Sequence, residues 1–157
     1  IEQLISAKEI YYRQYIDANL IFVPGVIEFI KQAATRYHLA IVSGALRSEI
    51  EHLLKQAGLS ELIKVIVAAG EVSPGKPNPA GYLQALRLLN RDFVQSSDPL
   101  FDRECLVFED SPWGVKAALA AGMSCYGVLT SYQSNELPGI KKSFKDFSAL
   151  TLADLNQ

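Results

Sequence analysis

The order of apolar runs and helix-like segments predicts an α/β protein in which a parallel sheet is covered by helices. Four short apolar runs lie at 39–42, 65–69, 106–108 and 124–129, and helix-like patterns separate them. Continuous apolar runs of this length are typical of strands buried on both faces. Strands that alternate with helices form parallel sheets. With 157 residues, of which 49% are hydrophobic and 20% charged, the chain can form one domain with a substantial core.

The amino-terminal half is expected to contain three helices. Apolar side chains at helical spacing predict the first over 1–18, and Pro24 opens a second that runs to about Arg36. After the first strand, the SEIE pattern at 48–51 resembles a capping box, with a serine followed by an acidic residue. It predicts a third helix that begins there and ends at Gly58, a residue suited to the turn after a helix.

The carboxyl-terminal half is organised around a stiff loop and a long connector. Segment 70–79 is rich in glycine and proline, and its Asn78-Pro79 pair is a typical helix start. The polar segment 90–103 is expected to connect that helix to the third strand. Beyond the fourth strand, one short strand near 143–147 and a last helical turn are expected.

The third strand ends in two adjacent carboxylates, Glu109 and Asp110, directly before a predicted helix. Ser111 suits the N-cap of that helix and Pro112 its first position, where a missing N–H costs nothing. Adjacent carboxylates repel each other, and a hard cation such as Mg²⁺ would relieve that repulsion. The alternative is that Asp110 merely caps the helix and that Glu109 is solvated.

Polar side chains follow the carboxyl end of every predicted strand, and those ends share one edge of a parallel sheet. The groups are a hydroxyl, an ammonium and two carboxylates, together with two backbone amides (Ser43, Lys76, Glu109, Asp110, Gly44 and Ala45). Hydroxyls, amides and lysine suit phosphoryl oxygens, whereas carboxylates suit Mg²⁺. Individually, Ser43 could be a turn residue and Lys76 could be solvated. Trp113 could touch a ligand, but packing is the expected role.

Composition excludes several classes of function. A net charge of −2 gives no electrostatic footprint for nucleic acid or an acidic membrane surface, and no apolar run reaches membrane-spanning length. Cys105 and Cys125 are expected to be reduced, buried thiols in a cytoplasmic protein. Neither a G-x-G-x-x-G segment after the first strand nor a Walker loop is present, so nucleotide binding is disfavoured. The oligomeric state stays open.

Three segments resemble the motifs of a known family. The segments VSGA at 42–45, GKPNP at 75–79 and VFEDSPWGVKAALAAGM at 107–123 resemble the second, third and fourth motifs of the haloacid dehalogenase-like hydrolases. The sub-type resembled is that of β-phosphoglucomutase and related sugar-phosphate phosphatases. The order and spacing match from about Pro24 to about Thr130. This resemblance implies a Rossmann-like core over 21–157 and a remnant of a helical cap domain over 1–20.

The resemblance also implies residue roles. Ser43 and the amides of Gly44 and Ala45 would bind the transferring phosphoryl group, and Lys76 would orient nucleophile and phosphate. Glu109 and Asp110 would bind Mg²⁺, directly or through water. The substrate would be a small phosphorylated metabolite.

One motif of the family has no counterpart. Its first motif, Asp-x-Asp, supplies the nucleophile, and no two aspartates in these 157 residues are two positions apart. In the family, the nucleophile strand lies between the strands that end here at Ser43 and Asp110. Without it, both neighbours would expose unpaired backbone groups, so we expect an upstream segment to supply that strand and most of the cap. The alternatives are that the two strands close up or that another chain fills the gap.

Three functional hypotheses follow. The favoured one is a Mg²⁺-dependent phosphatase that forms an aspartyl-phosphate on an upstream residue, in which case the 157-residue chain alone would be inactive. The second is a phosphomutase of the β-phosphoglucomutase type. The third is a non-catalytic remnant that binds phosphate or a protein partner.

Overall fold

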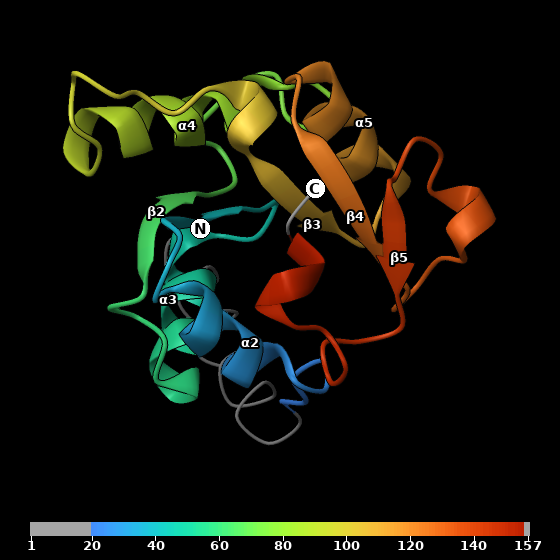
Figure 1. Ribbon diagram of the computed structural model, residues 1–157. Coiled ribbons are helices and arrows are strands. Elements are labelled where there is room, and N and C mark those ends of the chain that lie inside the picture. Colours follow the sequence, from blue (N-terminus) through green and yellow to red (C-terminus); the bar gives the residue numbers. More distant parts are fainter. Residues whose placement is uncertain (1–19, 156–157) are drawn as a thin grey trace, which may run out of the picture.

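Five short strands lie between two layers of helices in the computed structural model, which describes residues 20–155 (Figure 1). The predicted α/β class with parallel strands is confirmed. The strands are β1 (Leu39–Val42), β2 (Ile63–Val67), β3 (Leu106–Glu109), β4 (Ser124–Val128) and β5 (Lys142–Phe144). The helices are α2 (Val26–Ala33), α3 (Arg47–Ala57), α4 (Ala80–Asp92) and α5 (Pro112–Ala120), with short 3₁₀ turns at Asp102–Glu104, Ser134–Glu136 and Leu152–Leu155. The helix expected over 1–18 lies outside the described residues, and so do residues 1–19 of the cap remnant expected over 1–20.

The strands form two parallel sheets. β1 pairs with β2, so that Val42 lies opposite Val67, and β4 pairs with both β3 and β5. Within residues 20–155, no backbone ladder joins β1 to β3. The break falls between β1, which ends at Val42, and β3, which ends at Glu109. The alternative in which these two strands close up is wrong for the described residues.

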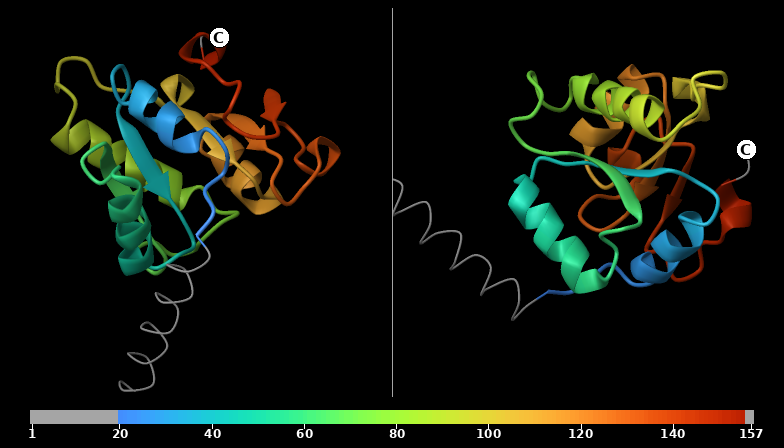
Figure 2. Two further views of the ribbon diagram at one scale, coloured as in Figure 1. Left: turned by 90° about the horizontal axis from the view of Figure 1, so that it is seen from below. Right: turned by 90° about the vertical axis from the view of Figure 1, so that its left-hand side faces the viewer.

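Alternating side chains of the strands point into two apolar layers. On one side, α4 and α5 cover the strands, and Val42 packs there with Tyr82 and Val115. On the other side lie α2 and α3, where Ile41 packs against Ile50. The right-hand view of Figure 2 shows α4 above the strands and α2 and α3 below them. These strands are therefore covered on both faces, which explains their continuous apolar sequences.

Two helices connect the separate sheets. On one face, Phe29 of α2 packs edge-on against Phe108 of β3, with ring centroids 5.5 Å apart, while the neighbouring Ile30 packs in the β1–β2 cluster. On the other face, Tyr82 of α4 shares a cluster with Val42 of β1 and with residues of α5 and β4. Helix packing therefore holds the halves together where backbone pairing does not.

Several predicted boundaries were wrong by a few residues. α3 begins at Arg47 instead of Ser48, because the Leu46 N–H donates to Glu49 Oε2 at 3.0 Å and so shifts the helix start. α2 ends at Ala33, and β2 begins two residues before the predicted strand. The predicted helix end at Gly58 is confirmed, since this residue adopts the left-handed conformation (φ 68°). Among the described helices, none is long and apolar enough to span a membrane.

Candidate active site

The junction of β3 and α5 carries the two acidic residues. Ser111 is the N-cap of α5, because its Oγ accepts the N–H of Gly114 at 3.1 Å, and Pro112 is the first helical residue. Both assignments confirm the sequence prediction. The alternative in which Asp110 caps the helix is wrong, and so is the alternative of a solvated Glu109, since that residue is only 6% exposed.

Glu109 is a buried carboxylate with three side-chain donors. Its Oε1 accepts from the Lys76 ammonium and from the Tyr82 hydroxyl, the latter at 2.5 Å. Its Oε2 accepts from the Ser111 hydroxyl at 3.2 Å. These donors, together with the amino-terminal end of α5, compensate the carboxylate for its lost hydration.

Lys76 lies between the two sheets. Its Nζ donates to the carbonyl oxygen of Val42 at 3.0 Å and also to Glu109, so it contacts the carboxyl ends of both β1 and β3. The side chain is 25% exposed, so the alternative of a solvated lysine is wrong. The structure thus brings together two of the predicted site residues, Lys76 and Glu109.

Ser43 directly follows the carbonyl group that Lys76 contacts. Its Oγ accepts the N–H of Ala45 at 3.1 Å, so the serine does act as a turn residue, as the alternative held. The turn leaves the exposed Gly44 beside open space, because a Cβ at this position would meet no atom within 4 Å. The Ser43–Ala45 turn therefore presents its backbone at the same sheet edge as Lys76.

Asp110 is exposed at the end of β3. It accepts a hydrogen bond from the Thr130 hydroxyl at 3.2 Å, which joins it to the segment that follows β4. Asp110 adjoins Glu109 along the chain, whereas no hydrogen bond between described residues joins Asp110 to Ser43. The predicted site residues therefore lie in a row along the carboxyl ends of the strands, with Lys76 and Glu109 in the middle of the row.

Comparison with known proteins assigns this chain to a family. A sequence model of that family, described as haloacid dehalogenase-like hydrolase, matches residues 2–122. The chain belongs to the haloacid dehalogenase-like hydrolases.

Relatives of this hydrolase chain include named phosphatases. Validoxylamine A 7'-phosphate phosphatase of Streptomyces hygroscopicus subsp. limoneus is 34% identical over 127 residues, which cover 80% of this chain and 55% of the relative. Protein CbbY of Rhodobacter capsulatus is 35% identical over 130 residues, covering 78% of this chain and 52% of that protein. The chain thus spans about half the length of these two relatives.

A crystal structure of a CbbY mutant from Rhodobacter sphaeroides, in complex with xylulose-(1,5)bisphosphate, has the same fold. Its TM-score is 0.83 at 26% identity, and the match covers 99% of this chain and 68% of that one. A putative β-phosphoglucomutase from Thermotoga maritima matches with a TM-score of 0.71 at 29% identity, over 85% of this chain and 60% of that one.

The acidic pair fits Mg²⁺ in part. No cluster of three or more His, Cys, Asp or Glu residues that could hold a metal occurs within residues 20–155. Mg²⁺, however, is commonly bound by one or two carboxylates together with substrate phosphate and water. The exposed Asp110 meets that requirement, whereas Glu109 Oε1 is already taken by two donors.

Sequence reasoning missed Tyr82 and misjudged Trp113. In the sequence Tyr82 only marks the helix that follows the 70–79 loop, but its hydroxyl reaches the acidic site. Burial, reinforced by the Glu109 carboxylate, raises the pKa of Tyr82 far above its ordinary value. The expectation that Trp113 has a packing role is wrong, because the residue is 57% exposed, with the Lys116 ammonium 5.0 Å from its ring centroid.

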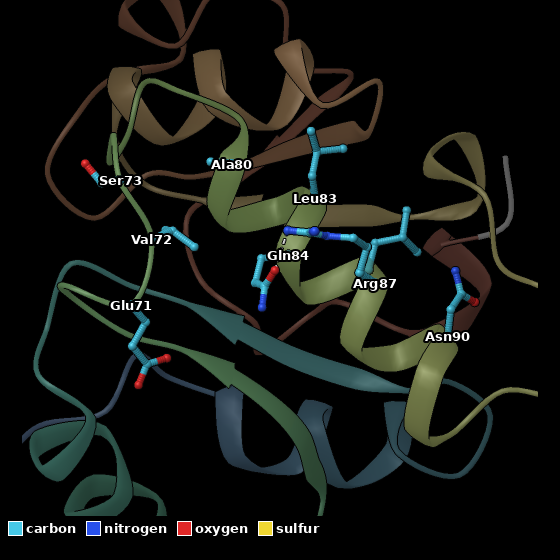
Figure 3. Close-up of a pocket in the computed structure, with 9 residues that line it drawn as sticks. Glu71, Val72, Ser73, Ala80, Leu83, Gln84, Arg87 and Asn90 are labelled. Carbon is cyan, nitrogen blue, oxygen red and sulfur yellow. Dashed lines mark hydrogen bonds between the residues drawn. The ribbon is translucent and has the colours of Figure 1, made fainter.

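A separate groove lies on the outer side of α4. It encloses about 750 Å³ and contains none of the predicted site residues. Figure 3 shows Arg87 and Gln84 joined by a hydrogen bond on its helical wall, with the segment 71–73 opposite. Glu71, which also lines it, is held by the Arg47 guanidinium at 2.6 Å and 2.9 Å. The groove and the site at the sheet edge are thus distinct features.

Proposed function

We propose that the complete gene product containing this chain is a Mg²⁺-dependent phosphatase of a small phosphorylated metabolite. The observation that carries the proposal is the contact of Lys76 with both Val42 and Glu109. It puts a cation at the carboxyl ends of β1 and β3, two strands that no backbone ladder joins within residues 20–155. The names of the relatives support a phosphorylated substrate, since one is a validoxylamine phosphate phosphatase.

The side chains at this edge have separate roles in the proposed reaction. Ser43 and the amide of Gly44 hold oxygens of the phosphoryl group. The Ala45 amide, which donates to Ser43 Oγ in this structure, joins them once it exchanges that bond for one to a phosphoryl oxygen. Lys76 offsets the charge of these oxygens as a point cation. Asp110, with Glu109 behind it, holds Mg²⁺. When bound, the metal supplies further charge stabilisation, which is the main catalytic requirement of phosphoryl transfer.

The nucleophile is proposed to be an aspartate on a strand that fills the break between β1 and β3. The carboxylate attacks phosphorus and the bond from phosphorus to the alcohol oxygen breaks, while the other aspartate of the upstream Asp-x-Asp gives its proton to that oxygen, so that the alcohol leaves neutral. The same aspartate takes a proton back from the attacking water in the next step. Water then hydrolyses the acyl phosphate, which releases inorganic phosphate and restores the carboxylate. Residues 21–157 would form the core and 1–20 a remnant of the cap. By this proposal, the 157-residue chain alone has no turnover.

A phosphomutase is the second candidate, favoured by the similarity to a putative β-phosphoglucomutase. Both enzymes would use the same core groups, so products discriminate between them. A phosphatase releases inorganic phosphate from a hexose monophosphate, whereas a mutase yields the isomeric hexose phosphate.

The decisive experiment is hydrolysis of p-nitrophenyl phosphate by the complete gene product with and without Mg²⁺. Asp110→Asn is expected to lower Mg²⁺-dependent turnover about 100-fold, the usual cost of losing one group that stabilises the transition state. The matched control is Asp98→Asn, which removes the same charge from an exposed loop. Wild-type turnover in Asp110→Asn would remove the metal assignment. The third hypothesis, a non-catalytic remnant, predicts no turnover in any variant and no upstream Asp-x-Asp in the reading frame.

A further inference from the structure

We propose that Tyr82 is a positioning residue of this site. Its hydroxyl fixes the Glu109 carboxylate, and Glu109 in turn holds the Lys76 ammonium at the edge shared by the two sheets. The positioning role itself is a matter of structure, and its consequence for phosphate chemistry rests on the proposed function.

Tyr82 contacts both members of the ion pair, with different parts of its side chain. The hydroxyl donates to Glu109 Oε1 at 2.5 Å, the same oxygen that accepts from Lys76. The ring lies under the Lys76 ammonium, which is 5.2 Å from its centroid, within the range of a cation–π contact. Tyr82 is only 6% exposed, so packing in the first turn of α4 fixes its ring.

The hydroxyl and the ring therefore make separable contributions. Phenylalanine at position 82 keeps the ring beneath Lys76 but removes one of the two donors to Glu109 Oε1. Because Glu109 is buried, a lost donor is not readily replaced by bulk water. The carboxylate then depends on Lys76 and Ser111 alone and is free to reorient, which relaxes the restraint on the ammonium.

The chain offers a matched control for this substitution. Tyr126 of β4 is a second buried tyrosine, at 0% exposure, and its hydroxyl donates to the carbonyl oxygen of Asp154 at 3.2 Å, a group outside the candidate site. Tyr82→Phe and Tyr126→Phe each remove one hydroxyl from a buried ring. Only Tyr82→Phe removes a donor to the site.

The first test is NMR of the lysine side-chain ammonium groups of the complete gene product. An ammonium held by two acceptors exchanges its protons slowly enough to be detected, so Lys76 should give a signal that Lys76→Met removes. That signal is expected to be lost or shifted in Tyr82→Phe and unchanged in Tyr126→Phe. An unchanged signal in Tyr82→Phe, or no protected Lys76 signal in the unsubstituted protein, overturns the positioning role.

The second test is turnover of p-nitrophenyl phosphate. Tyr82→Phe is expected to lower kcat about 10-fold with little change in KM, because the lysine acts on the charge that develops in the transition state. Tyr126→Phe should retain wild-type turnover. If both variants turn over like the unsubstituted protein, the catalytic consequence is overturned. If the Lys76 ammonium signal changes in Tyr82→Phe but the unsubstituted protein hydrolyses no phosphate ester, the proposed function fails and the positioning role stands.

Discussion

Gly114 lies directly against the carboxylate of Glu109: a Cβ atom at position 114 would overlap the carboxyl carbon and both of its oxygens. Alanine normally favours a helix over glycine by up to about 1 kcal/mol. At this position the sign should reverse, because the added methyl group would displace a buried carboxylate that has three donors. Glycine therefore fits this position of the DSPWG segment for a steric reason: the Glu109 side chain occupies the space that a Cβ atom would take.

Gly114→Ala is expected to destabilise the protein by about 2 kcal/mol, a typical cost of inserting a methyl group into a filled space. Urea denaturation measures this change. Gly75→Ala is the control, since a Cβ at Gly75 would meet no atom within 4 Å and its φ does not lie in the left-handed region. Equal stabilities of the two variants would contradict the close approach.

Lys76→Met should destabilise the protein by about 3 kcal/mol, because it leaves the Glu109 carboxylate buried without its cation. A double-mutant cycle with Glu109→Gln measures the coupling, and the double variant should lose less stability than the sum of the two single changes. Lys64→Met serves as the control, because this exposed lysine donates to the Glu61 carbonyl oxygen, at 3.0 Å, and not to a buried carboxylate. Additive effects at 76 and 109 would contradict the pairing.

The two cysteines should differ in reactivity. Burial and the Glu109 carboxylate raise the pKa of Cys125 to about 12, and this side chain is fully buried. Burial, with Asp102 and Glu104 nearby, also raises the pKa of Cys105, which is only partly buried. At pH 8 a thiol reagent should therefore modify Cys105 first. In Cys105→Ser, the remaining thiol should react only at the rate of unfolding, and rapid labelling would contradict its burial.

The Arg47–Glu71 pair should make a small, pH-dependent contribution to stability. The bond from Arg47 lowers the pKa of Glu71 below 4.5, so the unfolded chain binds the proton more readily. The stabilisation is present above pH 4.5 and is lost as the pH falls through the lowered pKa. Glu71→Gln should cost at most about 1 kcal/mol at pH 7, since the pair is exposed. The difference between variant and wild type should disappear in acid, and a constant difference would contradict the assignment.

The strands β1 and β3 were the most predictable elements. β1 coincides with the apolar run predicted for it, and β3 extends one residue beyond its predicted run. The polar residues that follow each run determine where the strand ends. β2 was misplaced because Lys64 interrupts its apolar run. Lys64 is exposed and donates to the carbonyl oxygen of Glu61 at 3.0 Å, so the strand contains a lysine without burying its charge.

The location of the candidate site at one edge of the sheet could be predicted from the sequence, whereas the contacts between its side chains could not. Sequence order indicated that Ser43, Lys76 and Asp110 follow strand ends, and parallel pairing brings such ends together. The direct contact of Lys76 with Glu109 depends on the path of the 70–79 loop, which no local pattern specifies. Tyr82 was missed because a tyrosine at helical spacing is typical of a core position, and its hydroxyl partner lies 27 positions away.

The break between β1 and β3 also divides the cooperativity of the fold. Amide protons of β4 are bonded within a three-stranded sheet and should exchange with solvent only through large openings of the chain. Amide protons of β1 and β2 belong to a two-stranded sheet. The hydrogen bonds between these two strands can open without breaking any hydrogen bond of the three-stranded sheet. Hydrogen–deuterium exchange of the 157-residue chain by itself, in which no described strand fills the break, should therefore report two protected units of unequal free energy, coupled through the packing of α2 and α4 rather than through the backbone.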